Sequence, residues 1–91
     1  MTVEPDDEPV DDLRVRLRRI DGQVRAVGSM LADGSECRDI VDRLGAATDA
    51  LGQVGFRLLV GGLTYCVEHP DEAVESGYPL DEGRRLFTTL A

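Results

Sequence analysis

The chain contains two cysteines, Cys37 and Cys66, and their spacing is its first sign of chemistry. On one straight helix the 29 residue steps from Cys37 to Cys66 (66 minus 37) would span roughly 43 Å, whereas the Cα atoms of a disulfide lie about 4.4–6.8 Å apart. Steps of about 100° nevertheless return Cys66 to within roughly 20° of the face that carries Cys37. Two copies paired antiparallel about residues 51–52 would therefore place Cys37 of one beside Cys66 of the other, with Gly52 and Gly55 permitting close approach.

The two thiols differ in their position along the predicted helix. Cys37 falls in its first turn, where the helix dipole and unbonded N–H groups favour a thiolate, and Cys66 lies near the C-terminal end, which disfavours one. We therefore predict that Cys37 is the nucleophile and Cys66 the resolving thiol. The alternative is that both are small buried apolar residues. His69, the only histidine, either faces the same way as Cys66 or is a surface or capping residue beside Pro70.

The residue one helical turn before Cys66 bears on metal binding. A metal site on this helix would need a ligand four residues before the cysteine, and Gly62 occupies that position. The sequence has no CxxC, no Ser/His/Asp set and no phosphate-binding glycine loop, and a single histidine leaves little general-base chemistry. These absences argue against an enzyme and leave the two thiols as the reactive groups.

Apolar residues at intervals of three and four predict two long helices. The first, of about 23 residues, ends at "ADGS" (32–35), with Gly34 as the breaker and Ser35 as the N-cap of the next helix. The second runs antiparallel to it from residue 36 to about residue 68. The two stripes consist of Leu13, Leu17, Ile20, Val24, Val27 and Leu31, and of Ile40, Leu44, Ala47, Leu51, Val54 and Leu58.

The remaining segments complete an all-α chain of three helices. Residues 1–8 form an acidic tail without periodicity, which we predict to be disordered, and residues 9–91 form a single helical domain. Residues 70–79 are predicted as a loop or a short helical turn, and residues 80–91 as a short C-terminal helix. Because the apolar faces exceed what three helices can cover, we expect an antiparallel helical-bundle dimer or a dimer of dimers.

Charge is unevenly distributed along the chain. The net charge is −8, but six of the 18 acidic residues lie among the first 12, which leaves 10 arginines against 12 acids in the remainder. Arg14, Arg16, Arg18 and Arg19 form a basic cluster, either a phosphate-contacting face or a solvated helix face with internal ion pairs. No segment is predicted to span a membrane or to act as a signal peptide, so we expect a cytoplasmic protein with reduced thiols.

Three segments together carry a family resemblance: "RLRRIDGQVRAVGSML" (16–31), "ECRDIVDRLGAATDALGQV" (36–54) and "RLLVGGLTYCV" (57–67). Over residues 13–67, and more loosely to its end, the chain resembles the copper-sensing operon repressor (CsoR/RcnR) family. The resemblance implies an all-helical repressor, a homodimer and usually a homotetramer. Such a repressor binds operator DNA until a ligand reaches a cysteine site between subunits.

The ligand implied by the resemblance depends on Gly62. In copper sensors of this type the ligands are cysteines at the positions of Cys37 and Cys66 and a histidine at the position of Gly62. A cysteine pair without the histidine is typical of the persulfide-sensing, sulfurtransferase-like (CstR-type) repressors, in which reactive sulfur species cross-link the two cysteines across the interface and DNA is released. Our first interpretation is therefore a repressor that senses persulfide or polysulfide through Cys37 and Cys66, without a cofactor.

Three alternatives remain beside that interpretation. The first is a Cu(I) sensor of the same fold, in which two thiolates, helped by His69, suffice because Cu(I) favours soft ligands. The second is a thiol peroxidase or sulfur-carrier enzyme, and the third is a helical interaction module with inert thiols. For DNA, the resemblance matches Arg16 to a basic residue that the family uses, with Arg14, Arg18 and Arg19 as neighbours. Gln53 stands where the second helix is often basic.

Overall fold

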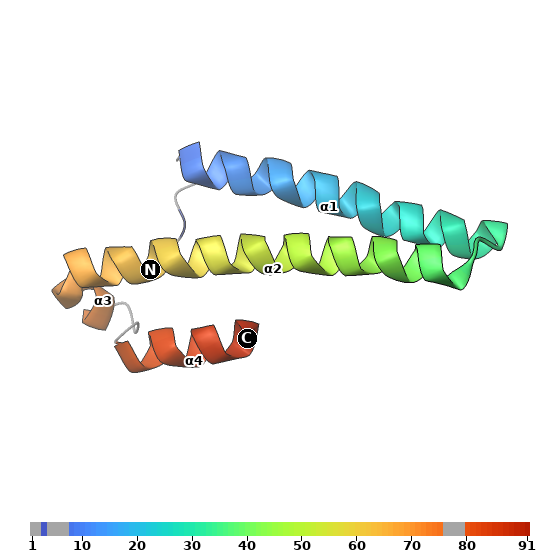
Figure 1. Cartoon of the computed structure of the whole chain (residues 1–91). Coiled ribbons are helices and arrows are strands. Elements are labelled where there is room, and N and C mark those ends of the chain that lie inside the picture. Colours follow the sequence, from blue (N-terminus) through green and yellow to red (C-terminus); the bar gives the residue numbers. More distant parts are fainter. Residues whose placement is uncertain (1–2, 4–7, 76–79) are drawn as a thin grey trace.

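Four helices make up most of what the structure describes, which is residue 3, residues 8–75 and residues 80–91. In the computed structural model they are α1 (Glu8–Asp33), α2 (Cys37–Glu68), α3 (Pro70–Glu75) and α4 (Leu80–Leu90) (Figure 1). No strand occurs among the described residues, so the predicted all-α fold, with two long antiparallel helices and a short C-terminal helix, is confirmed. α3 is the helical turn that was one of the two alternatives for residues 70–79.

The acidic tail is described only in small part. The structure describes only Val3 and Glu8 of this tail, so the predicted disorder concerns residues outside the described part of the chain. Glu8 is the first residue of α1 rather than the last residue of the tail, and Pro9 follows it in the first turn. A proline is tolerated there because the first N–H groups of a helix have no partner within the helix.

A tight turn at residues 34–36 reverses the chain between α1 and α2. Gly34 has a positive φ of 71°, which a residue with a Cβ rarely adopts, so its predicted role as the breaker is confirmed. The prediction that Ser35 is the N-cap of α2 is wrong, because Glu36 occupies that position without a side-chain cap bond. The reason is that the N–H of Ser35 donates to the carbonyl of Met30 at 3.0 Å, which makes Ser35 part of the end of α1.

α1 and α2 pack on each other through alternate members of their apolar stripes. Ile20 and Val27 of α1 are buried, as are Ala47 and Val54 of α2. The intervening residues of the same stripes stay exposed because no other element of the chain covers them. They are Leu17, Val24 and Leu31 on α1, and Leu44, Leu51 and Leu58 on α2.

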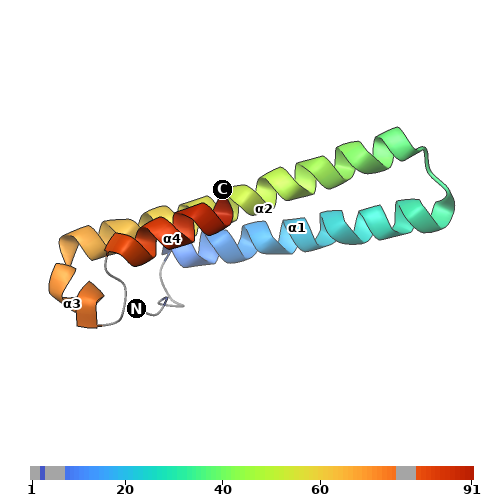
Figure 2. The ribbon, with the colours of Figure 1, turned by 90° about the horizontal axis from the view of Figure 1, so that it is seen from below.

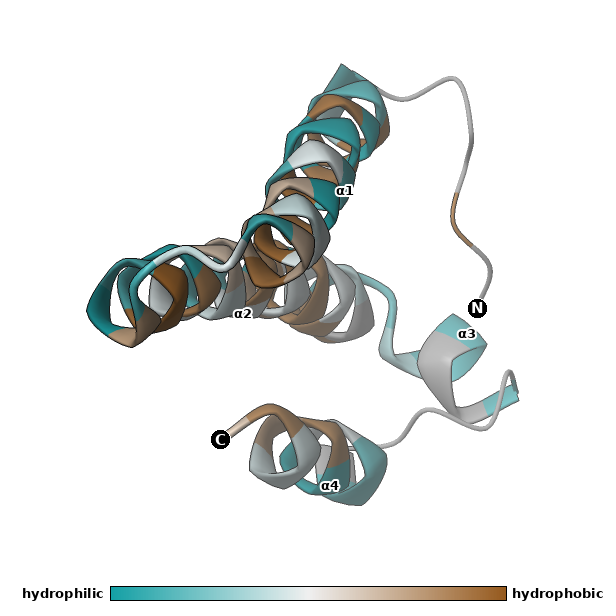
Figure 3. Ribbon diagram, turned by 90° about the vertical axis from the view of Figure 1, so that its right-hand side faces the viewer, coloured by the Kyte–Doolittle hydropathy of each residue, from teal (hydrophilic) through white to brown (hydrophobic). Residues whose placement is uncertain are grey.

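α4 lies on the opposite side of α2 from α1 (Figures 1 and 3). Two glycines allow this contact, since a Cβ atom added to Gly83 would lie 2.5 Å from Leu63 Cδ2, and one added to Gly55 would lie 2.8 Å from Leu90 Cδ2. The prediction that Gly55 serves the approach of two copies is therefore corrected: Leu90 of the same chain already occupies that space. Gly52 remains open, with nothing within 4 Å of an added Cβ.

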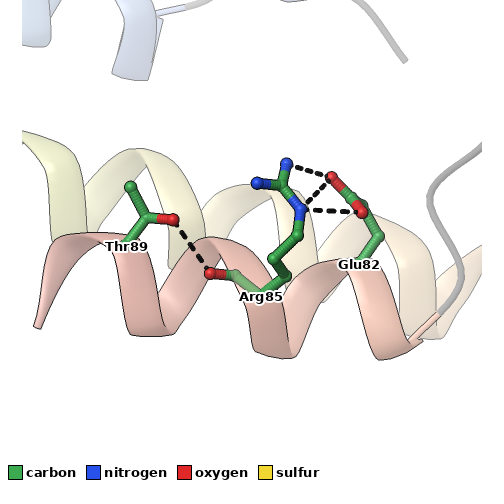
Figure 4. Close-up of polar contacts among 3 residues, drawn as sticks. All are labelled: Glu82, Arg85 and Thr89. Atoms are coloured by element: carbon green, nitrogen blue, oxygen red, sulfur yellow. Dashed lines mark hydrogen bonds and ion pairs between the residues drawn. The ribbon is translucent and has the colours of Figure 1, made fainter.

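The outer side of α4 is polar. Arg85 Nε donates hydrogen bonds to both carboxylate oxygens of Glu82, at 3.0 and 3.1 Å, and the hydroxyl of Thr89 donates to the carbonyl of Arg85 (Figure 4). The guanidinium holds the pKa of Glu82 below its ordinary value of 4.5. These contacts lie on solvent-exposed helix surface, so α4 depends for its position on the apolar residues that face α2.

The three helices α1, α2 and α4 form a thin, elongated array (Figures 1 and 2). Its extents are 54 × 28 × 14 Å and its radius of gyration is 16.9 Å, whereas a compact chain of this length has a radius of gyration of about 12 Å. Only five apolar residues, the four named above and Leu59, are buried among the described residues. The described part of the chain therefore has a small core, and the assembly with a second copy stays a prediction.

Candidate functional site

Cys37 is the first residue of α2, and its thiol is exposed and free. The predicted position in the first turn is thus confirmed. Glu36 makes no side-chain cap, although its carbonyl accepts hydrogen bonds from the N–H groups of Asp39 and Ile40. The thiol therefore lies at the N-terminal end of α2, where solvent and small reagents can reach it.

Cys66 lies in the last turn of the same helix, at the opposite end of α2 from Cys37 (Figure 1). Its backbone is helical, and its side chain lies outside the described part of the structure. Within one chain the two cysteines are thus not brought together, as the length of the helix requires. Their approach across two copies stays a prediction.

One face of α2 connects the two cysteine positions, and it is uncovered along most of its length but occupied at Gly55 by Leu90 of α4. Starting from Cys37, steps of three or four residues lead along one helix face to Cys66. Val41, Leu44, Leu51 and Leu58 on this face are about half exposed, at 58, 48, 52 and 48%. Because the stripe needs a covering partner and has a cysteine at each end, a second copy of α2 running the opposite way would complete both cysteine pairs at once.

His69 sits at the C-terminal end of α2, where it is the C-cap, and the predicted capping role is confirmed. Its N–H donates to the carbonyl of Tyr65 at 2.8 Å, and its ring stacks on the Tyr65 ring with centroids 4.5 Å apart. The Tyr65 hydroxyl donates in turn to Glu72 of α3. The ring stacking and this hydrogen bond fix the imidazole close to the turn that carries Cys66.

The metal-ligand set within a single chain is incomplete. Gly62 occupies the helical position one turn before Cys66 and offers no ligand atom. Among the described side chains, no three His, Cys, Asp or Glu residues lie close enough together to hold a metal ion. Any metal site on this surface must therefore use side chains from two copies or the Cys66 thiol.

The predicted DNA-binding arginines lie along the first half of α1. Arg14, Arg18 and Arg19 are exposed, and Arg16 is half-buried. Arg16 Nε donates to Asp12 Oδ2 at 2.8 Å, so this arginine has the internal ion pair that was the alternative to phosphate binding. The hydrogen bond holds the pKa of Asp12 below its ordinary value of 3.8.

Two further arginines act on the same carboxylate. After Arg16, the positive charges of Arg57 and Arg19 also lower the pKa of Asp12. Arg57 belongs to α2 and lines a shallow groove there together with Gln53 and Phe56. Sequence reasoning missed Asp12 and Arg57. The four-residue spacing from Asp12 to Arg16 predicts an ion pair on one helix face, whereas the approach of Arg57 to Asp12 depends on how the two helices pair.

Comparison with known proteins gives a consistent result. Residues 10–89 match the sequence model of a family described as metal-sensitive transcriptional repressor. The chain is 36% identical over 81 residues to the copper-sensing transcriptional repressor RicR of Mycobacterium tuberculosis, covering 89% of this chain and 81% of that protein. It is 34% identical over 67 residues to the copper-sensing transcriptional repressor CsoR of Bacillus subtilis, covering 74% of this chain and 63% of that protein.

A solved structure shares the fold. The crystal structure of the copper-sensing repressor CsoR with Cu(I) from Geobacillus thermodenitrificans superposes with a TM-score of 0.74 at 32% sequence identity. The match covers 98% of this chain and 90% of that one. No helix in the described part of the present chain is long and apolar enough to cross a membrane.

Proposed function

The chain belongs to the family of metal-sensitive transcriptional repressors, and we propose that it binds operator DNA through its arginines until a thiophilic inducer reaches Cys37 and Cys66 of neighbouring subunits. The observation that supports this proposal is the row of exposed apolar side chains on α2 (Val41, Leu44, Leu51 and Leu58), on the helix face that has a cysteine at each end. The relatives are repressors and not enzymes, which supports a regulator. Such a regulator acts in the cytoplasm, where it meets DNA.

Cu(I) is the inducer that the comparisons support. RicR and CsoR, the two curated relatives, are both described as copper-sensing. Two cysteine thiols would suit Cu(I), which favours soft ligands, and each would lose its proton to bind the metal as a thiolate. The imidazole of His69, fixed beside the turn of Cys66 by its stacking on Tyr65, is the nearest candidate for a third ligand.

Reactive sulfur is the second candidate, and Gly62 is the observation that favours it. A site without the histidine keeps both thiols available for covalent chemistry. The Cys37 thiolate attacks the outer sulfur of a persulfide, RSSH, to form a Cys37 persulfide and release the thiolate RS⁻. The Cys66 thiolate of the second copy then attacks the Cys37 sulfur, which forms the inter-subunit disulfide and releases HS⁻.

The test measures operator release and covalent state in the same samples. Fluorescence anisotropy follows a labelled duplex from the region upstream of the chain's own gene, during titration with Cu(I) and separately with polysulfide, and intact mass spectrometry follows the protein. Release by Cu(I) without a covalent change supports copper sensing. Release with a cross-linked dimer, with or without added sulfur atoms, supports sulfur sensing.

The cysteine variants provide the control for that experiment. Cys37→Ser and Cys66→Ser are expected to bind the duplex like the unsubstituted protein and to lose release by either inducer. Substitution of a residue outside the thiol pair, Ser29→Ala, is expected to leave release unchanged. The proposal is overturned if the two cysteine variants still release DNA at the same inducer concentrations.

A further inference from the structure

Asp12 lies among arginines from both long helices. Arg16 donates a hydrogen bond to its carboxylate at 2.8 Å, and the positive charges of Arg57 and Arg19 also lower the pKa of Asp12. Arg16 and Arg19 lie on α1, whereas Arg57 lies on α2. One carboxylate is therefore hydrogen-bonded to Arg16 and lies within electrostatic reach of Arg19 and Arg57.

The pairing of the helices explains how Arg57 reaches this position. α1 and α2 run antiparallel from the turn at residues 34–36, so residues at similar separations from the turn lie side by side. Asp12 and Arg57 have nearly equal separations from it, one on each helix. Arg57 is also exposed, so its guanidinium can contact a ligand.

The ion pair between Asp12 and Arg16 is less exposed than a second ion pair on α1, between Asp21 and Arg25. Asp21 and Arg25 form an ion pair at 3.2 Å with the same four-residue spacing, and their side chains are 62% and 80% exposed. The Arg16 side chain, in the pair with Asp12, is only 34% exposed. A less exposed arginine keeps a more fixed orientation, as a binding site for a tetrahedral anion requires.

We propose that Arg16, Arg19 and Arg57 form one phosphate-binding site spanning α1 and α2, and that Asp12 occupies this site when DNA is absent. The ligand is a phosphodiester group of the DNA backbone, so the inference rests on the proposed function. When a phosphate binds, Arg16 exchanges the Asp12 carboxylate for a phosphate oxygen, and Asp12 then repels the phosphate. Asp12 thus lowers the affinity for DNA, and Arg57 supplies a positive charge on α2, where Gln53 offers none.

Charge variants test this site directly. Duplex affinity is measured by fluorescence anisotropy over a range of salt concentrations, with the upstream duplex and with a mixed-sequence duplex. Arg57→Gln is expected to weaken binding of both duplexes to a similar degree and to reduce the slope of log affinity against log salt by about 0.9, the value for one phosphate contact. Asp12→Asn is expected to raise affinity about threefold to tenfold at low salt.

Two matched controls separate this effect from net charge and from helix-end effects. Asp11→Asn makes the same change of charge at the neighbouring position, and Asp21→Asn breaks the other aspartate–arginine pair of α1. Both are expected to change affinity less than about twofold. In the double variant Asp12→Asn with Arg57→Gln, the gain from Asp12→Asn should shrink, because part of the released positive charge is missing.

The outcomes distinguish this inference from the proposed function. The inference is overturned if Asp12→Asn binds no more tightly than Asp11→Asn, or if Arg57→Gln leaves the salt slope unchanged. If Arg57→Gln loses its helical circular dichroism signal, Arg57→Lys replaces it, and this variant is expected to keep the slope of log affinity against log salt. The comparison of Asp12→Asn with Asp11→Asn then decides whether the inference holds. Binding of both duplexes without release by any inducer would overturn the proposed function alone, whereas binding of neither at low salt would overturn both.

Discussion

At the scale of single residues, Cys37 begins α2 and its thiol is exposed. The position of Cys37 in the first turn of α2 follows from the pattern of its neighbours, because a helix start is a local property. Ser35 was misassigned by one residue, since its N–H completes the end of α1. The proximity of Arg57 to Asp12 could not be predicted, because it depends on the register between two helices.

Gly62 is the residue at which the choice of inducer can be tested. Gly62→His is expected to raise the affinity for Cu(I) by about tenfold or more, or about 1.4 kcal/mol or more, because it adds an imidazole one turn before Cys66. The measurement is competition with a colorimetric Cu(I) chelator. Gly61→His is the control, since that position is open and faces away by about 100°. Equal gains at both positions would contradict a preformed site.

At the scale of elements, periodicity predicted the helices, while the docking of α4 was accessible only from the structure. The three- and four-residue spacing located both long helices to within a few residues of their ends. It also placed Gly55 at a crossing point of two copies, although this glycine is covered by Leu90 of α4. The sequence shows that a glycine allows a close approach, but it does not show which helix makes that approach.

The glycine in α4 leads to a prediction about its docking. Gly83→Val is expected to lower the free energy of unfolding by about 1–3 kcal/mol relative to Gly22→Val, because the new side chain collides with Leu63. Gly22 is a helical glycine of α1 with open space around it, so it controls for the change in helix propensity. Urea unfolding followed by circular dichroism provides the comparison. Equal stability of the two variants would mean that α4 does not dock in this way.

At the scale of the whole molecule, the sequence predicts both a second copy and the face of α2 that it covers, and the assembly stays a prediction. The count of apolar residues already exceeded what three helices can bury. The structure adds that each stripe divides into a buried set and an exposed set, and that the exposed set of α2 carries the cysteine positions at its ends. Figure 3 shows α2 between α1 and α4, with apolar segments on each helix.

A charge placed on the exposed set of α2 tests the predicted assembly. Leu51→Asp lies near the midpoint between the cysteines and is expected to convert the oligomer to monomer and to lower its helical content, because a carboxylate would be buried at the contact. Val60→Asp is the control, since this exposed residue lies about 180° around the same helix. Sedimentation velocity reports the assembly, and an oligomeric Leu51→Asp protein would refute the predicted interface.

The 14 Å thickness of the chain also affects its lifetime in the cell. In the predicted assembly, a subunit would be stable only above the concentration at which two copies associate, so its folded fraction would rise with its own abundance. Below that concentration the separated helices open and become substrates for proteases. Newly made or diluted subunits should therefore be degraded faster than assembled ones, which removes surplus single chains and retains only the assembled regulator.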